Sequence, residues 1–196
     1  METIVIYGDR GERRLSDALI KLLDGAKKPF ILYRDERFSE RLHLRKYAKY
    51  LLVDTDNLEL VKEIPIHLIV MKNSVQTVRN SQIIGMKGCL VLLSGEGSRA
   101  RELLSGTGNP VISCGLSSKD TVTFSSISDS VLSIQRGFTD ITGQLVEQQD
   151  LTTGLRITLE NSYEKLAACT AMICLGLKEV LEHCGPGGQR RSAASI

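Results

Sequence analysis

Short apolar runs alternate with helical patterns over the first 114 residues of the chain. Each run has the length and the nearly continuous apolar character of a parallel strand that is covered on both faces. This alternation predicts an α/β fold built on an open, mostly parallel, doubly wound sheet in three layers. The predicted strands lie at residues 3–7, 29–33, 51–54, 66–71, 88–93 and 110–114.

The segments between these runs have helical periodicity. Between the first two runs, apolar residues recur on one helical face from Leu15 to Leu23, and the pattern ends at Gly25. The many basic side chains of 37–49 predict a second, more exposed helix. Further helices are predicted at 75–84 and 98–104, the latter ended by Gly106.

After Gly115 the pattern changes to short alternating runs rich in serine and threonine. Runs at 121–124, 131–134, 144–147 and 155–159 are typical of antiparallel hairpins. Asn161 and Glu164 then form a capping box that begins a helix returning to the main sheet.

We predict a single domain over 1–184. It consists of a parallel part at 1–115, an antiparallel β part at 116–160 with its strands within 117–160, and a helix at 161–184. Residues 185–196 are expected to be a disordered tail.

The composition excludes several classes of protein. The chain has 196 residues, 42% of them hydrophobic, and a formal net charge of +2, so it can bury one core but creates no broad basic field for nucleic acid. No apolar run reaches the roughly 20 residues that a membrane span needs. Five cysteines without Cys-x-x-Cys spacing and the lack of a cleavable leader predict reduced thiols, a cytoplasmic location and no metal site.

The segment 3–25 has the order of a nucleotide site: a strand, a glycine loop and a helix, as in P-loop and Rossmann-like folds. Such a loop needs glycines for close backbone approach, a lysine for the terminal phosphates and a Ser/Thr hydroxyl for magnesium. Gly8 and Gly11 are present, but Glu12 and Arg13 stand where the lysine and the hydroxyl would be. A carboxylate repels polyphosphate, so the loop predicts a non-catalytic relative of a nucleotide-using fold.

Four segments, in this order, resemble the central, ATP-binding domain of the Mur ligase family. Gly8-Asp-Arg-Gly-Glu-Arg resembles the family's Gly-Thr-Asn-Gly-Lys-Thr loop, and 88–97 resembles the strand that normally ends in Asn-x-Asp-Asp. Residues 109–127 resemble the valine-threonine-phenylalanine-glycine stretch and the turn after it, and 159–168 resembles the asparagine-containing start of a helix. The likeness covers nearly all of residues 1 to 182, and it implies an ATP-dependent ligase that forms an amide bond through an acyl phosphate.

Carried across residue by residue, the resemblance argues against that activity. Glu12 and Arg13 replace the loop lysine and hydroxyl, and Glu160 replaces the histidine expected near the nucleotide base. Asn73 is followed by Ser-Val-Gln where the family has Asp-His-Leu-Asp, so the groups near the metal are missing. The length of the sequence also leads us to expect that the family's flanking domains are missing. We therefore expect no catalytic residues, no metal ligands and a degenerate loop.

A vestigial nucleotide site remains as the binding hypothesis. Its candidate residues are Gly8, Asp9, Arg10, Gly11, Glu12, Arg13, Asn73, Glu96 and Asn161. Each has a plainer interpretation: the arginines as solvated side chains, Asn161 as a helix cap and Glu96 as part of a turn at the sheet edge.

The expected function is a non-catalytic Mur-ligase-like binding or regulatory module that needs no cofactor. Its expected partners are an unidentified protein or a small anionic ligand, with a homo-oligomer as another form, and neither nucleic acid nor membrane. The alternative is a subunit that binds a nucleotide or another anion at the Gly8–Gly11 loop, with ATP and magnesium as cofactors, and supports amide ligase chemistry together with a partner chain. A third hypothesis is an interaction scaffold whose cleft is filled by side chains.

Overall fold

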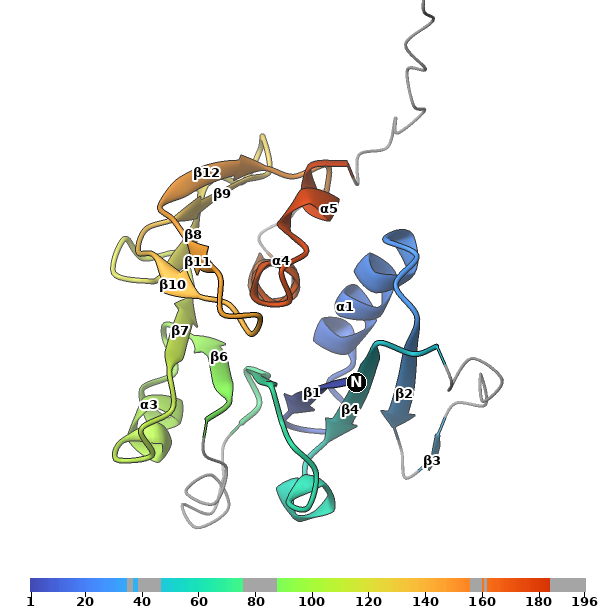
Figure 1. Ribbon diagram of the computed structural model, residues 1–196. Helices are drawn as coiled ribbons and strands as arrows, with labels where there is room; N and C mark the ends of the chain where they lie inside the picture. The colour runs from blue at the N-terminus through green and yellow to red at the C-terminus, as the bar shows by residue number, and fades with distance from the viewer. Residues whose placement is uncertain (35–36, 39–46, 76–87, 156–159, 161, 184–196) are drawn as a thin grey trace, which may run out of the picture.

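The computed structural model describes residues 1–34, 37–38, 47–75, 88–155, 160 and 162–183. Over these residues the chain forms one large sheet with helices on both faces, which confirms the predicted α/β class (Figure 1). The strand order is β12-β9-β8-β7-β6-β5-β1-β4-β2-β3. The main strands are β1 (Glu2–Tyr7), β2 (Phe30–Arg34), β4 (Tyr50–Thr55), β5 (Leu68–Met71), β6 (Leu90–Ser94) and β7 (Val111–Cys114).

These six strands are the ones that the apolar runs predict, and they pair in parallel. Strand β1 lies between β4 and β5, so the chain crosses over the sheet rather than adding neighbours in order. The carboxyl ends of β4 and β5 therefore flank the loop that follows β1. This placement brings together residues that are far apart in the sequence.

The antiparallel strands continue the same sheet. They are β8 (Val122–Ser126), β9 (Val131–Ile134) and β12 (Gln149–Thr152), while β10 (Phe138–Thr139) and β11 (Leu145–Val146) form a separate two-stranded sheet. Strand β8 joins the parallel part next to β7, at the pair Cys114 and Val122. Strand β12 is not among the runs that the sequence predicts, and 156–159 of the run expected at 155–159 lie outside the described residues.

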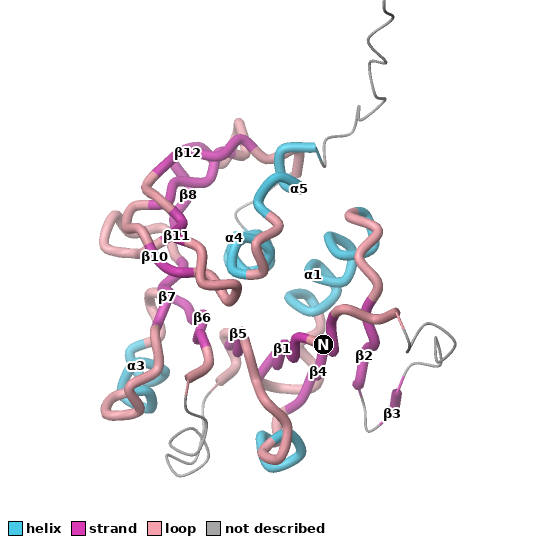
Figure 2. The backbone as a smooth tube through the Cα atoms, viewed as in Figure 1, coloured by secondary structure: helices cyan, strands magenta, loops and turns pink. Residues whose placement is uncertain are grey.

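Two helices cover one face of the sheet and pack side by side. They are α1 (Arg14–Gly25) and α4 (Ser162–Cys174), which Figure 2 shows next to each other. On the other face lie α3 (Ser98–Leu104) and the 3-10 turn η2 (Leu58–Val61). Alternate residues of β1 divide between these layers: Ile4 and Ile6 pack with α1 and α4, and Val5 and Tyr7 pack with η2 and α3.

The C-terminal helical region differs from the single helix expected at 161–184. Helix α4 ends at Cys174 and a second helix, α5 (Lys178–His183), follows. Gly176 between them has φ +69°, and the N–H of Leu177 bonds back to the carbonyl of Met172. This is a glycine-based helix end, which the apolar pattern does not reveal because that pattern continues through it. Asn161 and the tail from 184 lie outside the described residues.

The structure also differs from the helix expected at 37–49, in the part of that segment that it describes. Arg37–Phe38 form a short strand, β3, that pairs antiparallel with β2 at the sheet edge. Residues 39–46, and residues 76–87 of the helix expected after Val75, lie outside the described residues. Within the described part of the chain, no helix has both the length and the apolar character of a membrane span.

Asp120 is the buried polar residue that joins the parallel and antiparallel parts. Its carboxylate lies against the backbones of Gly95 and Gly115, where an added Cβ would stand 1.7 and 2.3 Å from its oxygens. Its Oδ2 accepts a hydrogen bond from the N–H of Ser117 at 3.2 Å. Glycine is therefore needed at both position 95 and position 115.

Replacing Gly95 by alanine is expected to lower the free energy of unfolding by about 2 kcal/mol, because the buried carboxylate must move and lose its partner. Equilibrium urea unfolding measures this. The matched control is Gly25→Ala, because a Cβ at Gly25 meets nothing within 4 Å. Equal stability of the Gly95 and Gly25 variants would contradict the packing described for Asp120.

Candidate functional site

The loop between β1 and α1 begins at a residue that must be glycine. Gly8 has φ +151°, and a Cβ there would stand 2.7 Å from the Cβ of Lys72. Lys72 follows β5 directly and its N–H bonds to the carbonyl of Tyr7 at 2.8 Å. The open space beside a phosphate-loop glycine is therefore taken by a side chain from the neighbouring strand.

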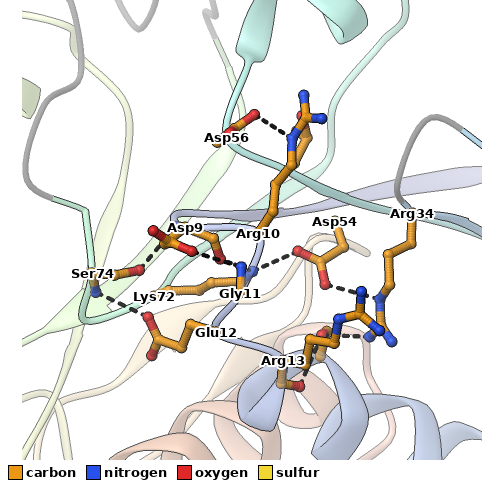
Figure 3. A network of polar contacts seen from close by, with 12 residues as sticks. Asp9, Arg10, Gly11, Glu12, Arg13, Arg34, Asp54, Asp56, Lys72 and Ser74 are labelled. Carbon is orange, nitrogen blue, oxygen red and sulfur yellow. Dashed lines mark hydrogen bonds and ion pairs between the residues drawn. The ribbon is translucent and has the colours of Figure 1, made fainter.

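Several backbone donors of this loop are satisfied within the protein (Figure 3). The N–H of Asp9 donates to Ser74 Oγ at 2.9 Å, and the N–H of Gly11 donates to the carboxylate of Asp9 at 2.6 Å. The N–H of Glu12 donates to the carbonyl of Asp9 at 3.2 Å. In a phosphate-binding loop such donors face the anion. Here the Asp9 carboxylate takes the place of an anion at one of them.

Lys72 carries the buried charge of the site. Its side chain is 0% exposed, and its Nζ donates to Asp54 Oδ1 at 2.6 Å and to the carbonyl of Asp9 at 2.8 Å. Asp54, at the end of β4, also accepts from Arg34 Nε at 3.1 Å. The Arg34 guanidinium reaches α1 as well, donating to Ser16 Oγ at 2.6 Å and to Asp17 at 2.9 Å. A chain of charges thus ties the loop, two strands and the first helix together.

The carboxylate at the expected lysine position is also engaged. Glu12 Oε2 accepts a hydrogen bond from the N–H of Ser74 at 3.1 Å, so it points across the loop toward the end of β5. Arg10 Nε pairs with Asp56 at 2.7 Å on the surface. Arg13 is exposed just before α1 and makes no side-chain cap to that helix.

A cavity of about 560 Å³ lies beside the loop, at the carboxyl ends of β5, β6 and β7 and the start of α4. Of the predicted site residues, Asn73 and Glu96 line it. Tyr163 closes one side and donates its hydroxyl to the carbonyl of Met71 at 2.6 Å. The pKa of Tyr163 is raised well above its usual value, first by burial.

The structure divides the predicted site residues into two groups. Gly8 to Arg13 form the loop, and Asn73 and Glu96 line the cavity next to it; Asn161 lies outside the described residues. Lys72 belongs to both groups, because it lines the cavity and holds the loop. Sequence reasoning missed Lys72 and Asp54. Their signal was a charged residue at or just after the carboxyl end of an apolar parallel strand.

Among the described residues, His67 and Cys114 have structural roles rather than nucleophilic ones. His67 Nδ1 accepts a hydrogen bond from the N–H of Thr3 at 3.1 Å, which is a structural role. Burial raises the pKa of the Cys114 thiol to about 12, and the thiol contacts Thr170 Oγ1 at 3.2 Å. Cys114 therefore stays protonated at neutral pH.

Comparisons define the class of fold. A scan against models of protein families finds no match, and a comparison with curated protein sequences finds none either. Mur ligases and folylpolyglutamate synthases are among the solved structures that match, and the chain has the fold of the Mur ligase central domain.

Three solved structures illustrate the likeness. UDP-N-acetylmuramoyl-L-alanyl-D-glutamate–2,6-diaminopimelate ligase matches with a TM-score of 0.60 and 11% identity over 93% of this chain and 45% of that one. MurF from Acinetobacter baumannii matches at 0.59, with 12% identity and the same coverage. Folylpolyglutamate synthase from Mycobacterium tuberculosis, complexed with ADP and AMPPCP, matches at 0.57 with 8% identity, over 92% of this chain and 57% of that one. The chain spans about half the length of these proteins.

Proposed function

We propose that this chain is a Mur-ligase-like domain without ATP-dependent ligase activity, acting in the cytoplasm as a binding or regulatory module. The observation that carries the proposal is the filled loop: the Asp9 carboxylate accepts from the N–H of Gly11, and Lys72 lies against Gly8. The residues present do not fit a triphosphate with magnesium. Glu12 adds a second carboxylate where a phosphate chain would lie.

The proposal includes no cofactor, and its partners are an unidentified protein, a small ligand or a second copy of the chain. The side chains of the loop also support the proposal because they form contacts within the protein. Asp9 and Glu12 accept hydrogen bonds from backbone N–H groups, so their presence can be explained without a nucleotide. Lys72, Asp54 and Arg34, which lie on the strands around the loop or directly after one, form a charged network that also requires no nucleotide.

ATP with magnesium is expected to leave the melting temperature unchanged. A ligand at 100 times its dissociation constant stabilises by about 2.7 kcal/mol, which for a domain of this size raises the melting temperature by roughly 5–10 °C. Thermal unfolding with 1 mM ATP and magnesium, and with magnesium alone as the control, measures this. A clear rise, or ATP turnover that is abolished by altering Gly11, would overturn the proposal.

The second candidate is a nucleotide- or anion-binding subunit that supports ligase chemistry with a partner chain. The observation that favours it is the Lys72 ammonium, which supplies a positive charge 2.8 Å from the loop carbonyl of Asp9. Stabilisation by ATP in the same experiment, without turnover, supports this candidate over the first.

A further inference from the structure

The cavity at the sheet edge has the size of a site for a small organic molecule. Its volume of about 560 Å³ falls within the range of roughly 300–1,000 Å³ that is typical of such sites. It also lies at the carboxyl ends of the parallel strands, where open α/β sheets bind ligands. Part of its lining is apolar, from Met71, Ala100 and Leu166. The cavity can therefore hold a molecule with an apolar body.

The charged groups that line the cavity are mainly acidic. Glu96, Glu160 and Glu164 contribute carboxylates, and Lys72 contributes the single ammonium of the described lining. That ammonium is directed away, to Asp54 at 2.6 Å and to the carbonyl of Asp9 (Figure 3). Glu96 and Glu160 are exposed, and Glu164 is half-buried. The cavity is therefore an unfavourable place for an anion.

The amino end of α4, which borders the cavity, does not reverse this sign. A helix start carries about half a positive charge. Glu164 lies in the first turn of α4 and Glu160 just before the helix, so two carboxylates already balance it. Acidic neighbours also act on Tyr163 in the cavity wall: after burial and Cys114, Glu12 and Glu164 are the groups that raise its pKa.

The arrangement of the carboxylates argues against a single metal ion. Glu96 follows β6, whereas Glu160 precedes α4 and Glu164 lies in the first turn of α4, so the carboxylates come from two separate elements. In the part of the chain that the structure describes, no three His, Cys, Asp or Glu residues are grouped so that they could hold a metal. Separated carboxylates suit a ligand whose positive charges are also separated.

We propose that this cavity binds a small organic cation with ammonium groups on an aliphatic body, such as an alkyl diamine. The ammonium groups pair with Glu160 and Glu164 at one side and with Glu96 at the other, and the methylene groups lie along Met71 and Leu166. This inference rests on the proposed function as a binding module and names its class of ligand. For the cavity, an organic cation replaces the anionic ligand that the sequence hypothesis named. The proposal makes no statement about ligands at the Gly8–Gly11 loop.

The test uses 1,5-diaminopentane as the probe, with 1,5-pentanediol and glutarate as neutral and anionic molecules of the same length. We expect the diamine alone to raise the melting temperature and to give a saturating isotherm in calorimetry at low salt. Glu160→Gln and Glu164→Gln should each weaken its binding about three- to five-fold, as expected of partly exposed ion pairs. Glu63→Gln, an exposed glutamate that does not line the cavity, is the matched control and should change nothing.

Several outcomes would overturn the inference. They are no diamine binding at 10 mM, stronger binding of glutarate, an equal loss in the Glu63 and Glu160 variants, or the same Glu160-dependent stabilisation by magnesium alone. The ATP experiment is scored separately. A failure of diamine binding with no ATP effect leaves the non-catalytic module intact, whereas ATP turnover rejects that module whatever the diamine does.

Discussion

Replacing Lys72 by methionine is expected to lower the free energy of unfolding by about 3 kcal/mol. The Lys72 side chain is 0% exposed and that of Asp54 only 2%, so the variant leaves a buried carboxylate with Arg34 as its remaining charged partner. Breaking a buried pair on one side costs about 3–5 kcal/mol, and the contact with Arg34 places the effect at the lower end. Methionine keeps the apolar stem that packs over Gly8. Urea unfolding should show a midpoint lower by roughly 1–2 M.

Two controls separate the buried pair from an ordinary surface charge. Arg10→Met removes a pair in the same loop, but its side chains are 38% and 47% exposed, so we expect a change under about 0.5 kcal/mol. The Lys72 effect should persist in 1 M salt because buried charges are poorly screened. A Lys72 variant as stable as the Arg10 variant would show that the ammonium is not buried against Asp54.

A double-mutant cycle tests the pairing itself. Combining Lys72→Met with Asp54→Asn removes both charges, so the double variant should lose less stability than the sum of the two single variants. Additive losses would mean that each residue acts through other neighbours, such as Arg34 for Asp54 and the Asp9 carbonyl for Lys72.

The strands and the glycine loop could be predicted from local pattern because each depends on its own residues. Apolar runs bounded by polar turns identify β1, β4 and β5 without knowledge of their neighbours. Strand β12, Gln149–Thr152, has only one buried apolar residue, Leu151, so its apolar pattern is too weak to predict a strand. Its pairing with β9 is what makes it a strand, and that contact is not local.

The charged network could not be predicted because it depends on strand order. Asp54 and Lys72 lie 18 positions apart, and they meet because β4 and β5 both pair with β1. The register places Asp54 opposite Ile6 and Met71 opposite Tyr7, so both side chains reach the loop after β1. The sequence shows an incomplete phosphate loop, but it does not show that Lys72 fills the space beside it.

Restoring the loop chemistry is expected to need three substitutions rather than two. Glu12→Lys and Arg13→Thr supply the ammonium and the hydroxyl, but the Asp9 carboxylate still accepts from the N–H of Gly11 at 2.6 Å. A carboxylate about 4 Å from a phosphate oxygen costs about 4 kcal/mol at an effective dielectric of 20, or roughly a thousand-fold in affinity. We therefore expect no ATP binding by the double variant, and binding in the micromolar to millimolar range when Asp9→Ala is added.

Calorimetry with ATP and magnesium measures the difference, and circular dichroism with thermal unfolding checks that each variant is folded. Adding Gly11→Val to the triple variant provides the negative control. A Cβ at position 11 would lie 3.0 Å from Oδ1 of Asp9 in the native loop, so the valine side chain would occupy the space that Asp9→Ala opens. Equal binding by the double and triple variants would show that Asp9 leaves the loop readily. A folded triple variant that binds no ATP would show that the backbone path itself has changed, with Lys72 over Gly8 as the remaining obstacle.

This experiment also decides between the two proposed functions on physical grounds. If only the triple variant binds, the native chain holds an intact backbone frame whose donors its own carboxylate occupies, and the native protein cannot exchange that group for a nucleotide at cellular concentrations. If the native protein binds ATP before any substitution, the Asp9 carboxylate must leave the N–H of Gly11, and the contacts that ATP makes must supply the free energy for that movement. The Asp9 carboxylate thus competes with ATP for the N–H of Gly11, and the gain in ATP affinity on Asp9→Ala measures the strength of that competition.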